Sequence, residues 1–332
     1  MAETLLHNSD RRIQDLQFQL QYLLEPIEKS RLELEKRTES FWTITALVML
    51  TLGMSFFYFG HMILVGVIVL AIIVASIIYY KKIINPKNIL KSNLNQNIIP
   101  HIIAEFLADS SFDAEKYISR QEYTNADLFR KDVDRYDGCN LISGILGETD
   151  LRFSKLHTEY KIETQDDKGR TKTSWHTIFE GILLIADSNK HIQGSTYIFP
   201  DTAERALGGV GRWFQEKFGS SGRGEMVYME NSIFEKLYVV YATDPVEARY
   251  LLTPAMQEYF IELSDYIGKD LIHASFIDGK LHLALSGSFD LFPFSLKRCL
   301  TEAETIKYYT ENLLRILKVI EILDLNTRIW GK

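Results

Sequence analysis

Five residues toward the C-terminal end have the side chains that a hydrolase uses: His273, His282, Ser286, Ser288 and Asp290. A nucleophilic serine needs a histidine base and a carboxylate beside it, and only the fold can bring them together. His282 and the serines lie on or just after one predicted strand, and the chain has no Gly-x-Ser-x-Gly motif. The eight histidines never take the spacing of a zinc site. We therefore expect no catalytic residue, no metal and no cofactor.

A second polar group follows the apolar stretch that ends at Asp187. Asp187, Asn189, Lys190 and His191 could form a small recognition site at the rim of a sheet. The same residue types also shape tight turns, which is the interpretation that they favour. We keep Asp187, Asn189 and Lys190 as candidate contacts for a ligand or a partner.

Arg249 is a further candidate for an anionic ligand or an acidic partner. It lies in a segment with the pattern of a helix start. Asp244 suits the N-cap, Pro245 the first helical position, and Glu247 the third position of a capping box. Local structure therefore accounts for this segment without a functional role for Arg249.

The elements that must position these residues indicate an α+β fold. Residues 140–164 predict two strands with a turn near Gly147, and the polar turn 165–172 leads to an apolar strand over 174–187. Asp278-Gly279 predicts a tight hairpin turn. The sequence thus predicts a mostly antiparallel sheet with packed helices, in a cytoplasmic domain of residues 97–332.

An uncharged stretch precedes this domain, since the 40 residues from Phe41 to Tyr80 include no Lys, Arg, Asp or Glu. At about 1.5 Å per residue this stretch would measure roughly 60 Å, twice the thickness of a bilayer core. We expect a transmembrane helical hairpin over 41–80 that turns at Gly60 and His61. The alternative is an apolar core hairpin of a soluble protein.

The charges on either side of the hairpin predict its orientation. Residues 1–40 and the basic connector 81–96 both carry cations next to the apolar stretch, namely Lys29, Arg31, Lys36 and Arg37 before it, and Lys81, Lys82, Lys87 and Lys91 after it. By the positive-inside preference, both termini lie in the cytoplasm, and Trp42 and the Tyr79-Tyr80 pair lie at the inner interface. The connector lysines either contact anionic lipid headgroups or act only in setting topology.

The N-terminal segment, residues 1–40, has an apolar stripe with steps of three and four residues: Ile13, Leu16, Leu20, Leu23, Ile27 and Leu34. Pro26 lies inside the pattern and should kink or divide the helix. The stripe predicts either oligomerisation through Leu16, Leu20, Leu23 and Ile27, or a helix packed on its own soluble domain.

Charge and cysteine content exclude some classes of protein. Residues 1–100 carry 10 basic and 8 acidic residues, whereas residues 101–332 carry 27 and 36. An acidic domain binds nucleic acid poorly. Two cysteines, Cys139 and Cys299, are too few for a disulfide framework or a zinc site.

Four blocks of sequence resemble a known family: YDGCNLISGILGETDLRFSKL, IFEGILLIADSNKHIQGSTYIFPD, VVYATDPVEARYLLTPAMQEYFIEL and SFIDGKLHLAL. Over most of residues 100–300 the chain resembles the bacterial domain-of-unknown-function family three-one-three-seven. The family usually has acidic residues where this chain has Cys139 and Asn140. The resemblance implies an N-terminal helix, a membrane hairpin and a soluble domain, working with other membrane-associated proteins such as LemA-like envelope proteins. It implies no activity, substrate or catalytic residue.

The sequence therefore predicts a membrane-anchored, non-enzymatic interaction or scaffold protein at the cytoplasmic face of a bacterial inner membrane. The alternative is a membrane-anchored domain that senses a ligand or a lipid. The expected partners are membrane lipid, other membrane-associated proteins and a second copy of the chain in a homo-oligomer, with no nucleic acid among them.

Overall fold

The computed structural model describes residues 9–59, 62–165, 171–188, 190, 192–201, 223–268 and 271–323. The chain divides into two compact units. The first unit comprises residues 1–102 and 292–311, and the second comprises residues 103–291 and 312–332. In this division residues 292–311 group with the N-terminal helices, and the expected domain of residues 97–332 stays a prediction.

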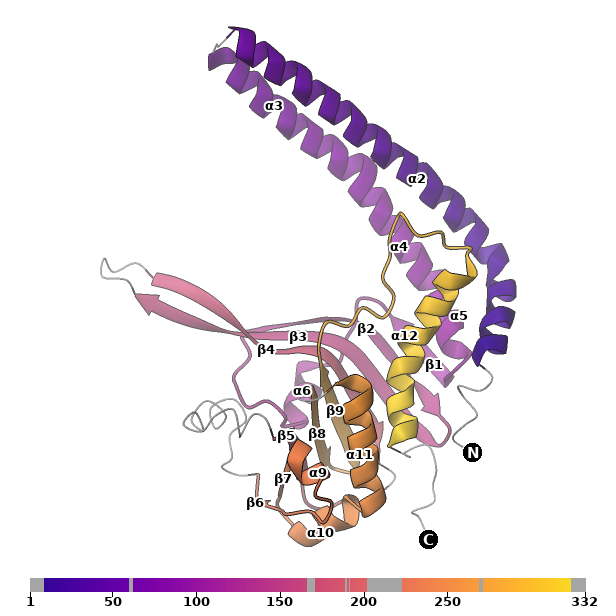
Figure 1. The fold of residues 1–332 in the computed structure, drawn as a ribbon, viewed down its shortest axis with the longest axis vertical. Coiled ribbons are helices and arrows are strands. Elements are labelled where there is room, and N and C mark those ends of the chain that lie inside the picture. Colours follow the sequence, from indigo (N-terminus) through magenta and orange to yellow (C-terminus); the bar gives the residue numbers. More distant parts are fainter. Residues whose placement is uncertain are drawn as a thin grey trace. The chain divides into compact units, whose positions relative to one another are not determined.

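The first unit is built from long helices. They are α2 (Ser9–Phe59), α3 (Met62–Tyr79), α4 (Asn85–Asn97), α5 (Ile99–Ala104) and the first part of α12 (Ala303–Ile322). A π-helical turn, Tyr80–Ile84, joins α3 to α4 without a break, so the basic connector 81–96 is helical. The helices α2 and α3 lie side by side as a hairpin (Figure 1).

Pro26 lies inside α2, which continues through it as one helix of 51 residues. Of the two predicted effects of Pro26, a kink or a division of the helix, the division does not occur. Figure 1 shows α2 bending in its N-terminal part, the effect expected of a proline that cannot donate to the preceding turn. The hydroxyl of Ser30 donates to the carbonyl of Pro26 at 3.0 Å.

One stretch of the described residues is long and apolar enough to cross a membrane, namely Ile68–Ala104. Of the 18 consecutive residues with the highest mean hydropathy in this stretch, only 6% are buried inside the structure. This finding gives one span and not the two-span hairpin that the sequence predicted. Gly60 and His61, the expected membrane turn, lie outside the described residues.

The second unit is built around a nine-stranded sheet with the order β1-β2-β3-β4-β9-β8-β5-β7-β6. The strands are β1 (Ala108–Asp113), β2 (Arg135–Leu146), β3 (Thr149–Gln165), β4 (Thr171–Asp187), β5 (Thr196–Pro200), β6 (Glu225–Met226), β7 (Tyr238–Ala242), β8 (Ile272–Ile277) and β9 (Lys280–Ser286). All pairings between described strands are antiparallel. The expected α+β class with a mostly antiparallel sheet is confirmed.

Two of the predicted turns have the backbone that their residues favour. Asp278 and Gly279 both have positive φ, 51° and 73°, and join β8 to β9. Positive φ at both central residues matches the twist of a tight hairpin, which explains the Asp-Gly pair. Gly147, with φ 62°, lies between β2 and β3 as predicted.

The strands β3 and β4 continue past the sheet as a two-stranded arm (Figure 1). The pairing of β2 with β3 ends at Glu159, whereas β3 and β4 stay paired out to Gln165 and Thr171. The arm carries Trp175, whose ring lies 3.4 Å from the guanidinium carbon of Arg135.

Helices and loops cover the sheet. They include α6 (Arg120–Asn125), α9 (Phe234–Leu237), α10 (Pro245–Leu251), α11 (Pro254–Ile267) and the end of α12. The helix α11 buries Met256, Phe260 and Leu263 along one stripe. A core cluster joins α6 and the loop after it to the sheet, and contains Tyr123, Phe129, Phe179, Phe199 and Ala284, among others.

Candidate functional site

The polar group at the rim of the sheet lies in the loop between β4 and β5, opposite the β8–β9 turn. Asp187 ends β4, and Asn189 lies outside the described residues. Ser188 fastens the loop, because its backbone N–H and its hydroxyl donate to the carbonyl of Gly279 at 3.0 and 2.7 Å. This geometry fits the turn interpretation of the sequence.

The start of α10 holds the other end of this loop. Asp244 is the N-cap, as predicted, and accepts from the N–H groups of Val246 and Glu247. The carboxylate of Glu247 reaches across to the loop and accepts from the N–H groups of Gln193 and Gly194 at 2.8 and 2.7 Å. Glu247 therefore ties two segments together.

Lys190 and Arg249 both lie at α10 but in different environments. The half-buried ammonium of Lys190 donates to the carbonyl of Leu251 at 3.3 Å and lies 5.7 Å from the ring of Tyr250. Burial lowers the pKa of Lys190. Arg249 is exposed and donates to Pro245 in its own helix at 3.4 Å. The loop thus uses Lys190 in structural contacts, and α10 leaves Arg249 open to solvent.

The two histidines that suggest a hydrolase belong to the core. His282 is 5% exposed, and burial lowers its pKa to about 4, so the imidazole is neutral near pH 7. His273 is also buried, with its ring 5.4 Å from that of Phe129. Ser288 and Asp290 follow β9 in a loop. Within the described part of the chain, no group of three or more His, Cys, Asp or Glu is placed to hold a metal ion.

A buried charge cluster in the second unit has no counterpart in the sequence predictions. The guanidinium of Arg223 donates to the carbonyls of Asp127 and Leu128 and lies 5.1 Å from the ring of Tyr197. The hydroxyl of Tyr197 donates to Asp127 at 2.8 Å, and Arg130 pairs with the same carboxylate at 2.6 Å.

The pKa shifts in this cluster follow from burial and charge. Burial lowers the pKa of Arg223 to about 10, against the opposing effect of Asp127. Burial alone would raise the pKa of Asp127, but hydrogen bonds from Arg130 and Tyr197 and the charge of Arg223 outweigh it and lower the pKa. Arg223 lies about 100 residues from Asp127 in sequence, so no local pattern could have paired them.

The predicted oligomerisation stripe is largely buried within the single chain. Leu16, Leu20 and Ile27 are buried, and Leu23 is half-buried. Burial favours the alternative interpretation, in which the stripe packs inside one copy. Oligomerisation through these residues stays a prediction.

A buried ion-pair group fastens α2 inside the first unit. Arg31 pairs with Glu28 at 2.8 Å and with Glu35 at 2.7 Å, and it donates to the carbonyl of Leu296. Glu28 also accepts from the N–H of Leu300 at 2.8 Å. Arg31, one of the predicted membrane-flanking cations, therefore has its charge balanced by two carboxylates.

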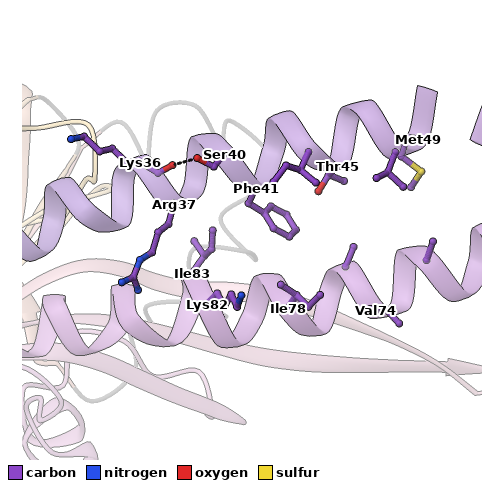
Figure 2. Close-up of a pocket in the computed structure, with 14 residues that line it drawn as sticks. Lys36, Arg37, Ser40, Phe41, Thr45, Met49, Val74, Ile78, Lys82 and Ile83 are labelled. Atoms are coloured by element: carbon purple, nitrogen blue, oxygen red, sulfur yellow. Dashed lines mark hydrogen bonds between the residues drawn. The ribbon is translucent and has the colours of Figure 1, made fainter. Parts of the chain in front are cut away.

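A hollow lined mostly by apolar side chains lies between α2 and α3 in the first unit. Figure 2 shows Arg37 and Phe41 of α2 pointing toward α3, whereas the Lys36 side chain extends to the other side of α2; the volume of the hollow is about 730 Å³. Most of its wall is apolar: Phe41, Ile44, Val48, Met49, Ala71, Val74, Ala75, Ile78 and Ile83. One end carries Lys36, Arg37 and Lys82, and no acidic residue contributes to the lining. We call this hollow the hairpin groove.

Aromatic rings mark the level at which the hairpin groove changes from apolar to basic. The ring of Tyr79 lies 5.2 Å from that of Phe41 and 5.6 Å from that of Trp42. Trp42 was predicted to lie at the same level as Tyr79 and Tyr80, and its ring is close to that of Tyr79. Aromatic side chains of this kind are typical of the interface between lipid and water.

These features define an α+β protein with a long helical hairpin and an amphipathic groove. The model of a family described as "Protein of unknown function (DUF3137)" matches residues 177–325, so this part of the chain is similar to that family. The match confirms the family that the sequence blocks indicate, although the block at 136–156 precedes the matched range. No curated protein and no solved structure matches the chain.

Proposed function

We propose that the chain is a membrane-anchored, non-enzymatic interaction module at the cytoplasmic face of a bacterial inner membrane. The observation that carries the proposal is the apolar surface of α2 and α3. Ile44 and Leu70, for example, are 62% and 61% exposed in the structure. A contiguous exposed apolar surface on two helices marks contact with a membrane or a partner.

The lengths of the two helices support two spans. Residues 41–59 of α2 and the 18 residues of α3 are each about 27–29 Å long at 1.5 Å per residue, close to a bilayer core. The backbone of both is helical, which satisfies their N–H and C=O groups within the segment. On this proposal the hairpin crosses twice, and both termini lie in the cytoplasm with the flanking cations.

The second unit supports an interaction role over a catalytic one. The histidines that suggested catalysis are buried in the core, and Lys190 and Glu247 hold a loop in place. The arm of β3 and β4 instead presents exposed side chains beyond the sheet, among them Trp175 and Ile162. Side chains of this type are common in protein interfaces.

The anchor is tested by alkaline extraction of membranes and by reporters fused to the C-terminus. We expect the chain to stay in the membrane pellet and a cytoplasmic reporter to be active. Release by alkali, or activity only of a reporter that works outside the cytoplasm, would refute the anchor or its orientation.

The interaction role is tested by crosslinking in cells. A photoreactive amino acid at Trp175 is expected to give a discrete adduct, whereas the same probe at Val246, an exposed position on α10, serves as the control. Equal yields at both positions would argue against a role for the arm. The alternative function, lipid or ligand sensing, is favoured by one observation, the hairpin groove.

A further inference from the structure

We propose that the hairpin groove binds one anionic phospholipid, with an acyl chain between α2 and α3 and the phosphate at Lys36, Arg37 and Lys82. This inference rests on the proposed membrane anchor and names a ligand for it. The proposed ligand is one lipid molecule held in a defined place. Such binding differs from the general attraction of basic residues to a membrane surface.

The size and shape of the hairpin groove suit such a ligand. Its volume of about 730 Å³ falls in the range of sites that hold small molecules. Figure 2 shows Phe41 and Met49 on α2 and Ile78 on α3 beside the hollow, which Thr45 and Val74 also line. A flexible hydrocarbon chain gains free energy for each methylene that it buries along such a wall.

The charges at the mouth select a negative headgroup. Lys36 and Lys82 form no ion pair with any residue that the structure describes, and the weak pair of Arg37 with Glu33 is 3.7 Å long and exposed. A second hollow in the same unit, of about 320 Å³, is lined by Glu35 and Glu39 as well as by lysines. Of these two hollows, only the hairpin groove therefore has an apolar wall, cations at one end and no acidic residue in its lining.

The position of the mouth matches the depth of a headgroup. Lys36 lies about six residues before Trp42, or roughly 9 Å along the helix. Lys82 lies three residues after Tyr79, in the π-helical turn. Turns of this kind recur at functional sites. A phosphate held by both lysines would lie just outside the aromatic level, where the polar layer of a bilayer begins.

The test uses the full-length protein in nanodiscs of equimolar phosphatidylglycerol and phosphatidylcholine with matched chains, followed by native mass spectrometry. The wild type is expected to retain one phosphatidylglycerol in preference to phosphatidylcholine. The double variant Lys36→Gln, Lys82→Gln should weaken retention by at least tenfold, because each cation near the headgroup contributes to the attraction. The matched control is Lys81→Gln, Lys91→Gln, which removes the same charge from residues outside the lining and should change retention less than twofold.

A second pair of variants tests the apolar wall. Val74→Trp would fill the hairpin groove, whereas Val69→Trp adds the same bulk to an exposed position of α3 outside the lining. We expect Val74→Trp alone to abolish retention. Equal effects of the two lysine pairs, retention unchanged by Val74→Trp, equal retention of both lipids, or no retained lipid would each overturn the proposal.

Alkaline extraction of the same variants separates the two proposals. If the wild type and all variants stay in the membrane while the lipid results fail, only the lipid site is wrong. If the wild type itself is released, the anchor proposal fails first.

Discussion

His282 offers a sharp test of the packing inside the sheet. Its imidazole is buried beside Ser275 on β8 and Ile185 on β4, and its Nδ1 has no hydrogen-bond partner among the described residues. Burial lowers its pKa from 6.5 to about 4, and the nearby charges of Lys280 and Arg152 act in the same direction. Between pH 6.5 and about pH 4 the folded protein therefore keeps His282 neutral, whereas the same histidine binds a proton in the unfolded chain.

The direction of the pH effect follows from this difference. The stability that the neutral His282 contributes is fully present above its unfolded pKa of about 6.5. It is lost as the pH falls towards its folded pKa of about 4. A pKa unit corresponds to about 1.4 kcal/mol, so the wild type should lose about 2–3 kcal/mol of its free energy of unfolding between pH 7 and pH 4.5 through this one group. For a unit of this size that is a fall of roughly 5–10 °C in Tm.

The assay compares His282→Leu with the wild type by urea unfolding of the full-length protein in detergent at several pH values. The variant cannot titrate, so its free energy of unfolding should lack this part of the pH dependence, whatever its stability at pH 7. His157→Leu, at a partly exposed position of β3, is the matched control for the loss of one histidine. If His282→Leu and the wild type lose the same free energy between pH 7 and pH 4.5, the burial argument is wrong.

Two further substitutions test the sheet and the first unit. Gly181→Ala should disrupt β4, because a Cβ there would lie 2.0 Å from the carbonyl oxygen of Leu285. We expect the free energy of unfolding, measured in urea, to fall by more than the about 1–3 kcal/mol of ordinary overpacking. Gly53→Ala is the control and should be tolerated, because its Cβ meets nothing within 4 Å. Arg31→Met should cost about 3–5 kcal/mol in thermal unfolding, because it leaves the buried carboxylate of Glu28 without its ion pair. Arg37→Met breaks only an exposed pair and should cost about 0–1 kcal/mol. Wild-type stability of Gly181→Ala or of Arg31→Met would contradict these contacts.

Local signals predicted the parts of the sheet that depend on turns. The Asp278-Gly279 pair and Gly147 each impose a backbone that only a few residues adopt, so the sequence marks those hairpins directly. The strand β1 has no such signal: the helix α5 ends at Ala104, and Ala108–Asp113 then pairs with β2. Pairing with a distant strand decides that segment, and no local pattern records it.

One missed element did have a readable signal. The helix α6 begins with a complete capping box, in which the side chain of Ser119 accepts from Glu122 N–H and the carboxylate of Glu122 accepts from Ser119 N–H. Ser and Glu three residues apart are the ordinary mark of a helix start. The loop after this helix brings Asp127 to Arg223, so α6 positions a cluster that the sequence could not show.

The hairpin groove was unpredictable for a different reason. Each cation at its mouth was noted as a membrane flank, but Lys36 and Lys82 belong to opposite ends of the apolar stretch. Only the antiparallel packing of α2 against α3 places them at one end of one hollow. Arg31 shows the converse, because its sequence position suggests a free cation while the fold pairs it with Glu28 and Glu35.

On the two proposals, orientation in the membrane and recognition of a lipid draw on overlapping but different sets of cations. The positive-inside preference acts while the chain inserts, before Arg31 has found its carboxylates, so all eight flanking cations count toward topology. In the folded chain the charge of Arg31 is balanced, and only cations that face the hairpin groove can hold a phosphate there. Substituting Lys36 and Lys82 leaves six of the eight flanking cations in place, so the hairpin should keep its orientation while the lipid site is lost. A single variant can thus separate how the protein enters the membrane from what it binds there.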